Sequence, residues 1–163
     1  MKKLLSFMMI MLFIVGGVTL SACGNEDSYV ATASFSYSAD KGVTYGNAQK
    51  EYTVGETIYM KVDVKVTSTN ENAEAIKLTL TIPNITAVDA KYYDGQIITP
   101  TYDVLQRVTT YNFTVMASTT AVEWTFLFQF IPNGEAEICM GLVFDDHVNS
   151  IYDKQNTIRF VEG

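Results

Sequence analysis

The chain has 163 residues, of which 48% are hydrophobic, and its 18 acidic residues outnumber its 11 basic ones, which gives a formal net charge of −7 at pH 7. An acidic chain whose basic residues are scattered gains no affinity for nucleic acid through counterion release, and anionic lipid headgroups repel it as well. We therefore expect no nucleic-acid partner.

The first 22 residues have the layout of an export signal. Lys2 and Lys3 give a positive start, residues 4–18 are apolar, and Ser21 and Ala22 are small residues that lead into Cys23. A membrane-spanning helix needs roughly 20 apolar residues, and glycine and hydroxyl side chains dilute the end of this run. A plain secretory signal, the other alternative, needs no cysteine at this place.

The order Leu-Ser-Ala-Cys at positions 20–23 resembles the lipobox of bacterial lipoproteins. This resemblance implies that residues 1–22 are cleaved off, that the Cys23 thiol carries a diacylglycerol, and that the protein stays at the cell membrane on its extracytoplasmic face. Two acyl chains, at about 0.8 kcal/mol per buried methylene, hold a protein firmly. Residues 23–29 then form the lipidated cysteine and a tether that reaches at most about 20 Å.

Without residues 1–22 the chain keeps 141 residues, and its charge becomes −9 because the two lost charges are lysines. This length is enough for one domain, expected at residues 30–163. Cys139 is then the only thiol that carries no lipid, so no intramolecular disulfide can form. It lies in the apolar, strand-like segment from Ile138 to Phe144, where we expect a buried and unreactive thiol.

Alternation of apolar and polar residues with a period of two dominates the chain after residue 30 and predicts strands with one buried face. The clearest alternation lies at residues 58–66, 76–82, 111–115 and 122–130. The last of these segments carries the most apolar face, so we expect it to be the central strand. Leu127, on its opposite face, predicts partial cover there too.

The remaining signals complete an all-β pattern. Asn133-Gly134, within the expected turn at residues 132–135, tolerates the positive φ of a tight hairpin, which predicts a return strand at residues 137–144. Weaker strand signals lie at residues 30–37, 52–54, 85–92, 96–99 and 157–161. No window shows a helical period with caps, so the sequence predicts a single β-sandwich.

Two segments resemble bacterial immunoglobulin-like surface domains. Residues 52–57 (Tyr-Thr-Val-Gly-Glu-Thr) lead into the strand at 58–66, and residues 133–138 (Asn-Gly-Glu-Ala-Glu-Ile) lead into a strand that ends at Asp145-Asp146. The resemblance spans most of residues 30–161 and implies an immunoglobulin-like β-sandwich of about 7–9 strands. The cysteine pair of antibody domains is missing, and a fold of this kind assigns no function by itself.

Tyrosines are the candidate partner contacts. Tyr92 and Tyr93 precede Asp94 at a turn, and Tyr59 falls on the polar phase of its strand. Such side chains combine a flat apolar ring with a polar tip, which suits sugars and peptides. The alternative is that these rings seal the rim of the sandwich.

Acidic residues near the C-terminal end are the candidate metal ligands. Asp145, Asp146 and Asp153 could gather oxygen ligands for calcium, although their spacing matches no defined calcium loop. His147, the only histidine, has no partners for a catalytic triad, and one histidine with one cysteine does not make a zinc site. We expect no cofactor, no catalytic residue and hence no enzyme.

The sequence thus predicts a lipid-anchored, non-catalytic module of the cell envelope that binds a protein or glycan near the membrane. Exposed sheet edges or the loop at residues 92–95 would form the contact. The alternative is a small-ligand or calcium-binding lipoprotein that serves a membrane transporter, although the chain is short for the two-lobed form of such proteins.

Overall fold

The structure is a computed structural model, and it describes residues 29–38, 40–69, 71, 74–87, 90–92, 97–144 and 149–163. All regular secondary structure in these ranges is β-strand. No helix within them is long and apolar enough to cross a bilayer. The strands are β1 (Tyr29–Ser38), β2 (Glu51–Thr53), β3 (Ile58–Ser68), β4 (Glu74–Pro83), β5 (Ile85–Ala87), β6 (Ala90–Tyr92), β7 (Ile97–Ile98), β8 (Thr101–Asp103), β9 (Val108–Ala117), β10 (Val122–Pro132), β11 (Ala136–Phe144) and β12 (Asn149–Val161).

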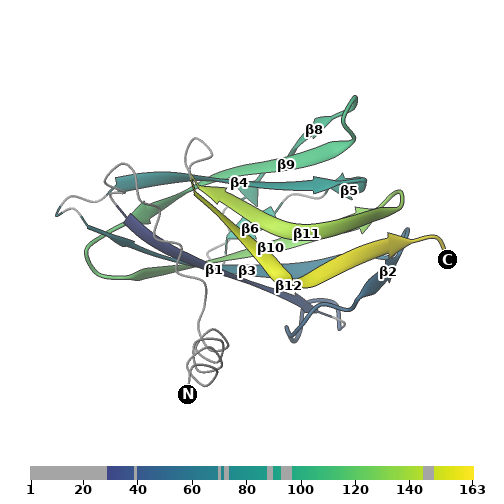
Figure 1. Ribbon diagram of the computed structural model, residues 1–163, viewed down its shortest axis with the longest axis horizontal. Helices are drawn as coiled ribbons and strands as arrows, with labels where there is room; N and C mark the ends of the chain where they lie inside the picture. Colours follow the sequence, from purple (N-terminus) through teal and green to yellow (C-terminus); the bar gives the residue numbers. More distant parts are fainter. Residues whose placement is uncertain are drawn as a thin grey trace, which may run out of the picture.

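Two six-stranded sheets face each other (Figure 1). Sheet A has the order β1-β3-β10-β6-β7, with β5 also paired to β10, and sheet B has the order β2-β12-β11-β4-β9-β8. All pairs are antiparallel except that of β2 with β12. The predicted all-β sandwich is therefore confirmed.

The strand order is that of the immunoglobulin class. Strands β1, β3 and β10 take the places A, B and E, while β12, β11 and β4 take the places G, F and C, with β9 beside β4 in the place of C′. Seven strands have nine residues or more, which agrees with the predicted number, and the other five have only two or three. The short strands β5 to β8 form an insertion between β4 and β9.

The core lies between the sheets and consists of the apolar phase of each long strand. In β3 and β4 every second side chain is buried without exception from Ile58 to Val66 and from Ile76 to Ile82. Strand β10 lies between β3 and β6, which confirms its predicted central place, and its Leu127 is half-buried on the outer face. Burial of one such side chain stabilises the fold by about 1.5–3 kcal/mol.

The turn at residues 132–135 differs from its prediction. It joins β10 of sheet A to β11 of sheet B, so it crosses between layers and closes no hairpin. Gly134 does not take a positive φ. Period-two alternation shows which face of a strand is buried, but it does not show in which sheet the next strand lies.

Hydrogen bonds tie three connections together at this end of the sandwich. Asn84, between β4 and β5, has a φ of 50°, and its backbone N–H donates to the Arg107 carbonyl at 2.8 Å. The Asn84 carbonyl accepts from the Asn133 N–H at 2.9 Å, and its side-chain amide donates to the Glu135 carbonyl at 2.8 Å. Asparagine is one of the few residues with a side chain that tolerates this backbone conformation.

Thr109 is a polar residue on the buried face of β9, and its hydroxyl has no hydrogen-bond partner within the described part of the chain. An unsatisfied buried hydroxyl destabilises a fold, and replacing it with a methyl group removes that cost. We expect Thr109→Val to raise the free energy of unfolding by about 1 kcal/mol in denaturant titration. Thr81→Val, at an exposed position of β4, is the control and should change it little. A clear loss of stability in Thr109→Val would show that the hydroxyl has a partner.

Candidate functional site

Most of the residues singled out from the sequence lie outside the part of the chain that the structure describes. The candidate loop and the calcium and lipid predictions are therefore not tested, and they stay predictions. Cys23, Tyr93, Asp94, Asp145, Asp146 and His147 lie outside the described residues, as do the side chains of Tyr92 on β6 and Asp153 on β12. Among the described residues, no three His, Cys, Asp or Glu side chains gather as a metal site.

Tyr59 lies half-buried on the outer face of β3, among polar groups. The chain passes close over it, since a Cβ atom on Gly42 would lie 3.5 Å from the Tyr59 ring. Beside it the Lys61 ammonium lies 5.8 Å from the centre of the Tyr45 ring and 2.8 Å from a carboxylate oxygen of Asp63. Tyr59 is thus part of a surface covered by the connection between β1 and β2, rather than an isolated exposed ring.

That connection begins as a compact loop organised by Asp40. Its carboxylate accepts hydrogen bonds from the Ser38 hydroxyl at 2.6 Å and from the Thr44 amide and hydroxyl at 2.8 and 2.7 Å. The loop ends where Tyr37 and Gly46 exchange two backbone hydrogen bonds of 2.8 Å. The hydrogen bond from Ser38, followed by those from Thr44, lowers the pKa of Asp40 from 3.8 to about 2.

We expect the Asp40 carboxyl to titrate near pH 2 in an NMR measurement of its side-chain carbon. Because its pKa is lower in the folded than in the unfolded chain, the ionised group stabilises the fold above pH 3.8, and this stabilisation is lost as the pH falls to about 2. Ser38→Ala removes the strongest hydrogen bond and should raise the midpoint. Ser34→Ala, at a position without contact to Asp40, is the control. A midpoint near 3.8 in the unaltered protein would contradict this account.

A pocket of about 240 Å³ lies beneath this loop, lined in part by the rings of Tyr37, Tyr45 and Tyr52. The Tyr52 hydroxyl accepts a hydrogen bond from the Gln49 N–H at 3.1 Å. Burial raises the pKa of both Tyr45 and Tyr52 above 10, although the Lys61 ammonium partly offsets this for Tyr45. Both phenols therefore keep their proton at neutral pH.

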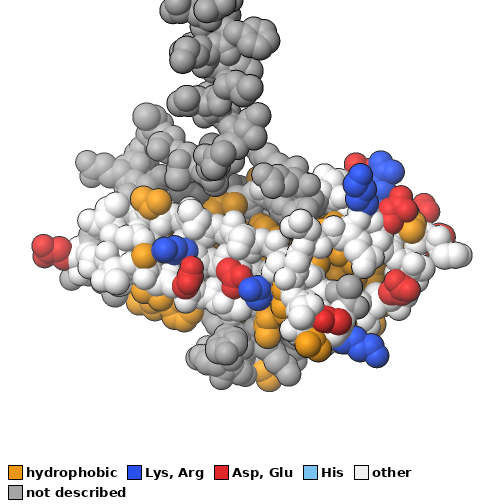
Figure 2. Space-filling model, turned by 90° about the horizontal axis from the view of Figure 1, so that it is seen from below, with side chains coloured by type: hydrophobic (Ala, Val, Ile, Leu, Met, Phe, Trp, Pro, Cys, Tyr) orange, Lys and Arg blue, Asp and Glu red, His pale blue; other side chains and the backbone are white. Residues whose placement is uncertain are grey.

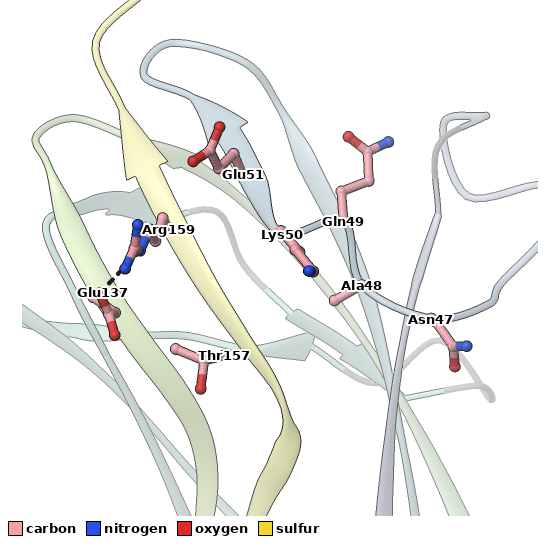
Figure 3. Close-up of a pocket in the computed structure, with 8 residues that line it drawn as sticks. All are labelled: Asn47, Ala48, Gln49, Lys50, Glu51, Glu137, Thr157 and Arg159. Carbon is pink, nitrogen blue, oxygen red and sulfur yellow. Dashed lines mark hydrogen bonds and ion pairs between the residues drawn. The ribbon is translucent and has the colours of Figure 1, made fainter.

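A wider groove of about 660 Å³ continues from this pocket, and Asn47 and Gln49 line both. Figure 3 shows that its walls come from three segments: residues 47–51, which lead into β2, and parts of β11 and β12. The Arg159 Nε atom lies 3.0 Å from a carboxylate oxygen of Glu137, with both side chains more than half exposed. The groove is lined by Asn47, Ala48, Gln49, Lys50, Glu51, Glu137, Thr157 and Arg159.

The chemistry of the groove favours a polar ligand without large net charge. Its two cations, Lys50 and Arg159, are balanced by the carboxylates of Glu51 and Glu137, and amides and a hydroxyl complete the lining. Such groups can exchange hydrogen bonds with sugar hydroxyls or with a peptide backbone, and the adjoining tyrosine rings offer flat apolar surface. On the face seen in Figure 2, positively and negatively charged side chains are likewise mixed.

The prediction that Cys139 is a buried thiol is wrong. Cys139 is exposed on β11, while Ile138 and Met140 on either side of it are buried. The cause is the strand's own alternation, because Ile138, Met140, Leu142 and Phe144 take the inward phase and leave Cys139 on the outward one. This alternation can be read from the sequence alone, and it predicts an exposed Cys139.

Sequence reasoning also missed the hairpin of β8 and β9. The hairpin extends beyond the neighbouring strands (Figure 1), and Val104 and Leu105 at its tip are 74% and 96% exposed. Asp103 shapes the turn, since its carboxylate accepts hydrogen bonds from the amides of Leu105 and Gln106 at 2.8 and 3.0 Å. The two apolar residues of the Asp-Val-Leu-Gln segment are adjacent, so hydrophobic periodicity gives no signal for this hairpin.

No protein-family model matches the sequence, and no curated protein is similar to it. Several solved structures resemble the fold, among them the following two. The first, titled "AvmM Catalyzes Macrocyclization in Alchivemycin A Biosynthesis", has 13% identity and a TM-score of 0.45 over 91% of this chain and 97% of that one. The second, a 35 kDa C-terminal fragment of the major pilin GBS80 of Streptococcus agalactiae, has 9% identity and a TM-score of 0.44 over 80% of this chain and 55% of that one.

The first of these structures contradicts the prediction that the chain is not an enzyme, because that protein is described as catalysing a macrocyclization. Catalysis is therefore no longer excluded. At 13% identity and a TM-score of 0.45 the likeness assigns neither a reaction nor a residue to this chain. Neither likeness bears on what this chain binds.

Proposed function

We propose that this protein is a lipid-anchored module of the cell envelope that binds a protein or glycan partner close to the membrane. The observation that carries the proposal is the sequence Leu-Ser-Ala-Cys at positions 20–23, followed after a few residues by the first strand of a β-sandwich. The cysteine would hold the lipid, and the sandwich would be the part that meets the partner.

The short tether supports a partner near the membrane. Strand β1 begins at Tyr29, so the five residues from Gly24 to Ser28 separate the lipidated cysteine from the sandwich. An extended segment of this length spans at most about 20 Å. The domain would then stay within about its own diameter of the membrane surface, where other envelope proteins and the membrane-proximal glycans lie.

The groove and the tyrosine pocket support binding of a polar chain. They adjoin along residues 47–49, and together they offer balanced charges, amides and aromatic rings on one side of the sandwich. Binding sites that recognise extended polar ligands combine these groups. The calcium alternative depends on Asp145, Asp146 and Asp153, whose side chains the structure does not describe.

Lipidation of Cys23 is tested by growing cells that express the full chain with an alkyne-labelled fatty acid. We expect the label on the N-terminal peptide of the mature protein, which should begin at Cys23. Cys23→Ala should lose the label and leave the membrane fraction, while Cys139→Ser, which alters the other cysteine, should behave as the unaltered protein does. A mature protein that carries no lipid, or that keeps residues 1–22, would refute the anchor.

Binding through the groove is tested by cross-linking the lipidated protein on intact cells and identifying what it captures by mass spectrometry. Glu137→Ala and Gln49→Ala should reduce the captured partner several-fold, because both side chains line the groove and an exposed ion pair adds little to stability. Thr81→Ala, exposed on the same sheet outside the groove, is the matched control. Equal capture by all variants would place the contact elsewhere, and no capture by any would count against the binding function itself.

A further inference from the structure

Strand β1 forms an outer edge of sheet A, and it is the longest stretch of open edge among the strands whose side chains the structure describes throughout. It pairs with β3 over all ten residues without a shift in register. The other edges are shorter or interrupted. β2, β7 and β8 have two or three residues each, β9 extends seven residues beyond its pairing with β8, and β12 has an irregular register between Tyr152 and Thr157. Open edges of this kind are the usual template for pairing with another strand.

The hydrogen bonds of Tyr37 show which backbone groups on β1 point away from β3. Tyr37 exchanges its two outward bonds with Gly46, and the direction alternates along an antiparallel strand. The N–H and C=O groups of Ala31, Ala33 and Phe35 therefore point outward as well. Within the described ranges these three residues have no backbone partner on that side.

The side chains of β1 do not protect this edge. Tyr29–Ser38 contains no lysine, no other charged residue and no proline, although these are the residues that normally keep edge strands apart. The chain from residue 23 onward has a charge of −9, so two copies repel each other over most of their surface. An uncharged edge is the place where they can meet at the least electrostatic cost.

We propose that a second copy of this chain pairs with β1, edge to edge and antiparallel, about a two-fold axis at Ala33. Sheet A would then continue from one copy into the other. Ala33 would form two backbone hydrogen bonds with Ala33 of the second copy. Ala31 would bond in the same way to Phe35 of the second copy, and Phe35 to Ala31 of the second copy. The strand on the far side, β3, is already antiparallel to β1, so this orientation continues the sheet.

The side chains of β1 are complementary to themselves in this register. Ala31, Ala33 and Phe35 face inward and are half-buried at the margin of the core. A two-fold axis at Ala33 sets the large Phe35 beside the small Ala31 of the second copy, and the two Ala33 side chains beside each other. The exposed face brings Thr32 opposite Ser34, so no charges meet. Apolar surface at the open margin of both cores would be buried across the joint.

The pairing does not require the lipid, but the proposed anchor would favour it. Confinement to a membrane raises the effective concentration of one copy around another. With the two-fold axis normal to the membrane, both β1 strands lie parallel to its surface, and both tethers leave at the same height. Pairing of a short edge can then be weak in solution and still be populated at the membrane.

Charge pairs across the joint test the register. The double substitution Thr32→Lys and Ser34→Lys brings lysines opposite each other in the dimer. It also lowers the overall negative charge of each copy, which by itself would reduce the repulsion between copies and favour dimerisation. Thr32→Glu with Ser34→Lys places opposite charges there, and within each chain it sets them beside Lys65 and Asp63, their neighbours on β3. In sedimentation equilibrium of residues 23–163 with both cysteines replaced by serine, the first pair should weaken dimerisation roughly tenfold or more, and the second should restore it.

A backbone variant tests the hydrogen bonds. Ala33→Pro removes an N–H that points away from β3, and proline is tolerated on an edge strand at such a position. It should abolish the dimer and leave the unfolding midpoint nearly unchanged. Ser34→Pro, whose N–H points toward β3, is the contrasting control and should destabilise the fold itself.

Disulfide trapping extends the test to the membrane, with Cys139→Ser in every variant. On phosphatidylcholine vesicles, lipidated Thr32→Cys and Ser34→Cys chains should cross-link when mixed, because opposite residues of such a pair lie about 4.5 Å apart at Cα. Each variant alone should cross-link far less. The proposal fails if the protein is a monomer both in solution and on vesicles, if the lysine pair or Ala33→Pro leaves the dimer intact, or if β1 captures a different protein and never its own copy.

Discussion

Aromatic rings from the two sheets meet in the space between the layers, and this packing holds the other parts of the molecule in place. Phe113 of sheet B lies 4.4 Å from Phe126 of sheet A between ring centres, and Tyr111 lies 5.1 Å from Phe128 at a near-perpendicular angle. Contacts of this geometry add about 0.5–1.5 kcal/mol each beyond the burial of area. The domain contains no disulfide among its described residues, so this core has to supply the stability that cross-links give to many exported domains.

The same core fixes the surface where ligands can bind. Because β3 buries Met60 and Val62, its polar phase must point outward, and that phase carries Tyr59, Lys61 and Asp63. The loop around Asp40 lies over these groups, and residues 47–51 continue from it to the pairing of β2 with β12. The tyrosine pocket and the polar groove are consequences of this path, since one connection between β1 and β2 lines both.

The four strands with the clearest alternation could be predicted to within three residues at each end, whereas β12 begins eight residues before its prediction, and no pairing could be predicted. The alternation from Ile58 to Val66 requires a buried and an exposed face wherever the strand lies, and the structure agrees to within two residues at its end. Whether β11 pairs with β10 or crosses to the other sheet depends on contacts far apart in the chain. The apolar composition of residues 138–144 favours a buried Cys139, whereas the phase of the strand places it on the exposed face. Val104 and Leu105 at the hairpin tip show no hydrophobic periodicity, because they belong to a turn that is held by the hydrogen bond from the Leu105 amide to Asp103.

The pairing of β2 with the end of β12 also sets when sheet B can be completed during synthesis. Residues 51–53 pair with residues 159–161. Ile58 to Val66 on β3 pair with β1, which precedes them in the chain, and gain their second partner from residues 122–130. Ile158 and Phe160 on β12 are themselves buried in the core. A growing chain that emerges N-terminus first therefore has all strands of sheet A once residue 132 has been made, but it cannot complete sheet B before residues 159–161. A nascent chain without β12 therefore carries the strands of sheet A but lacks the part of the core that Ile158 and Phe160 supply.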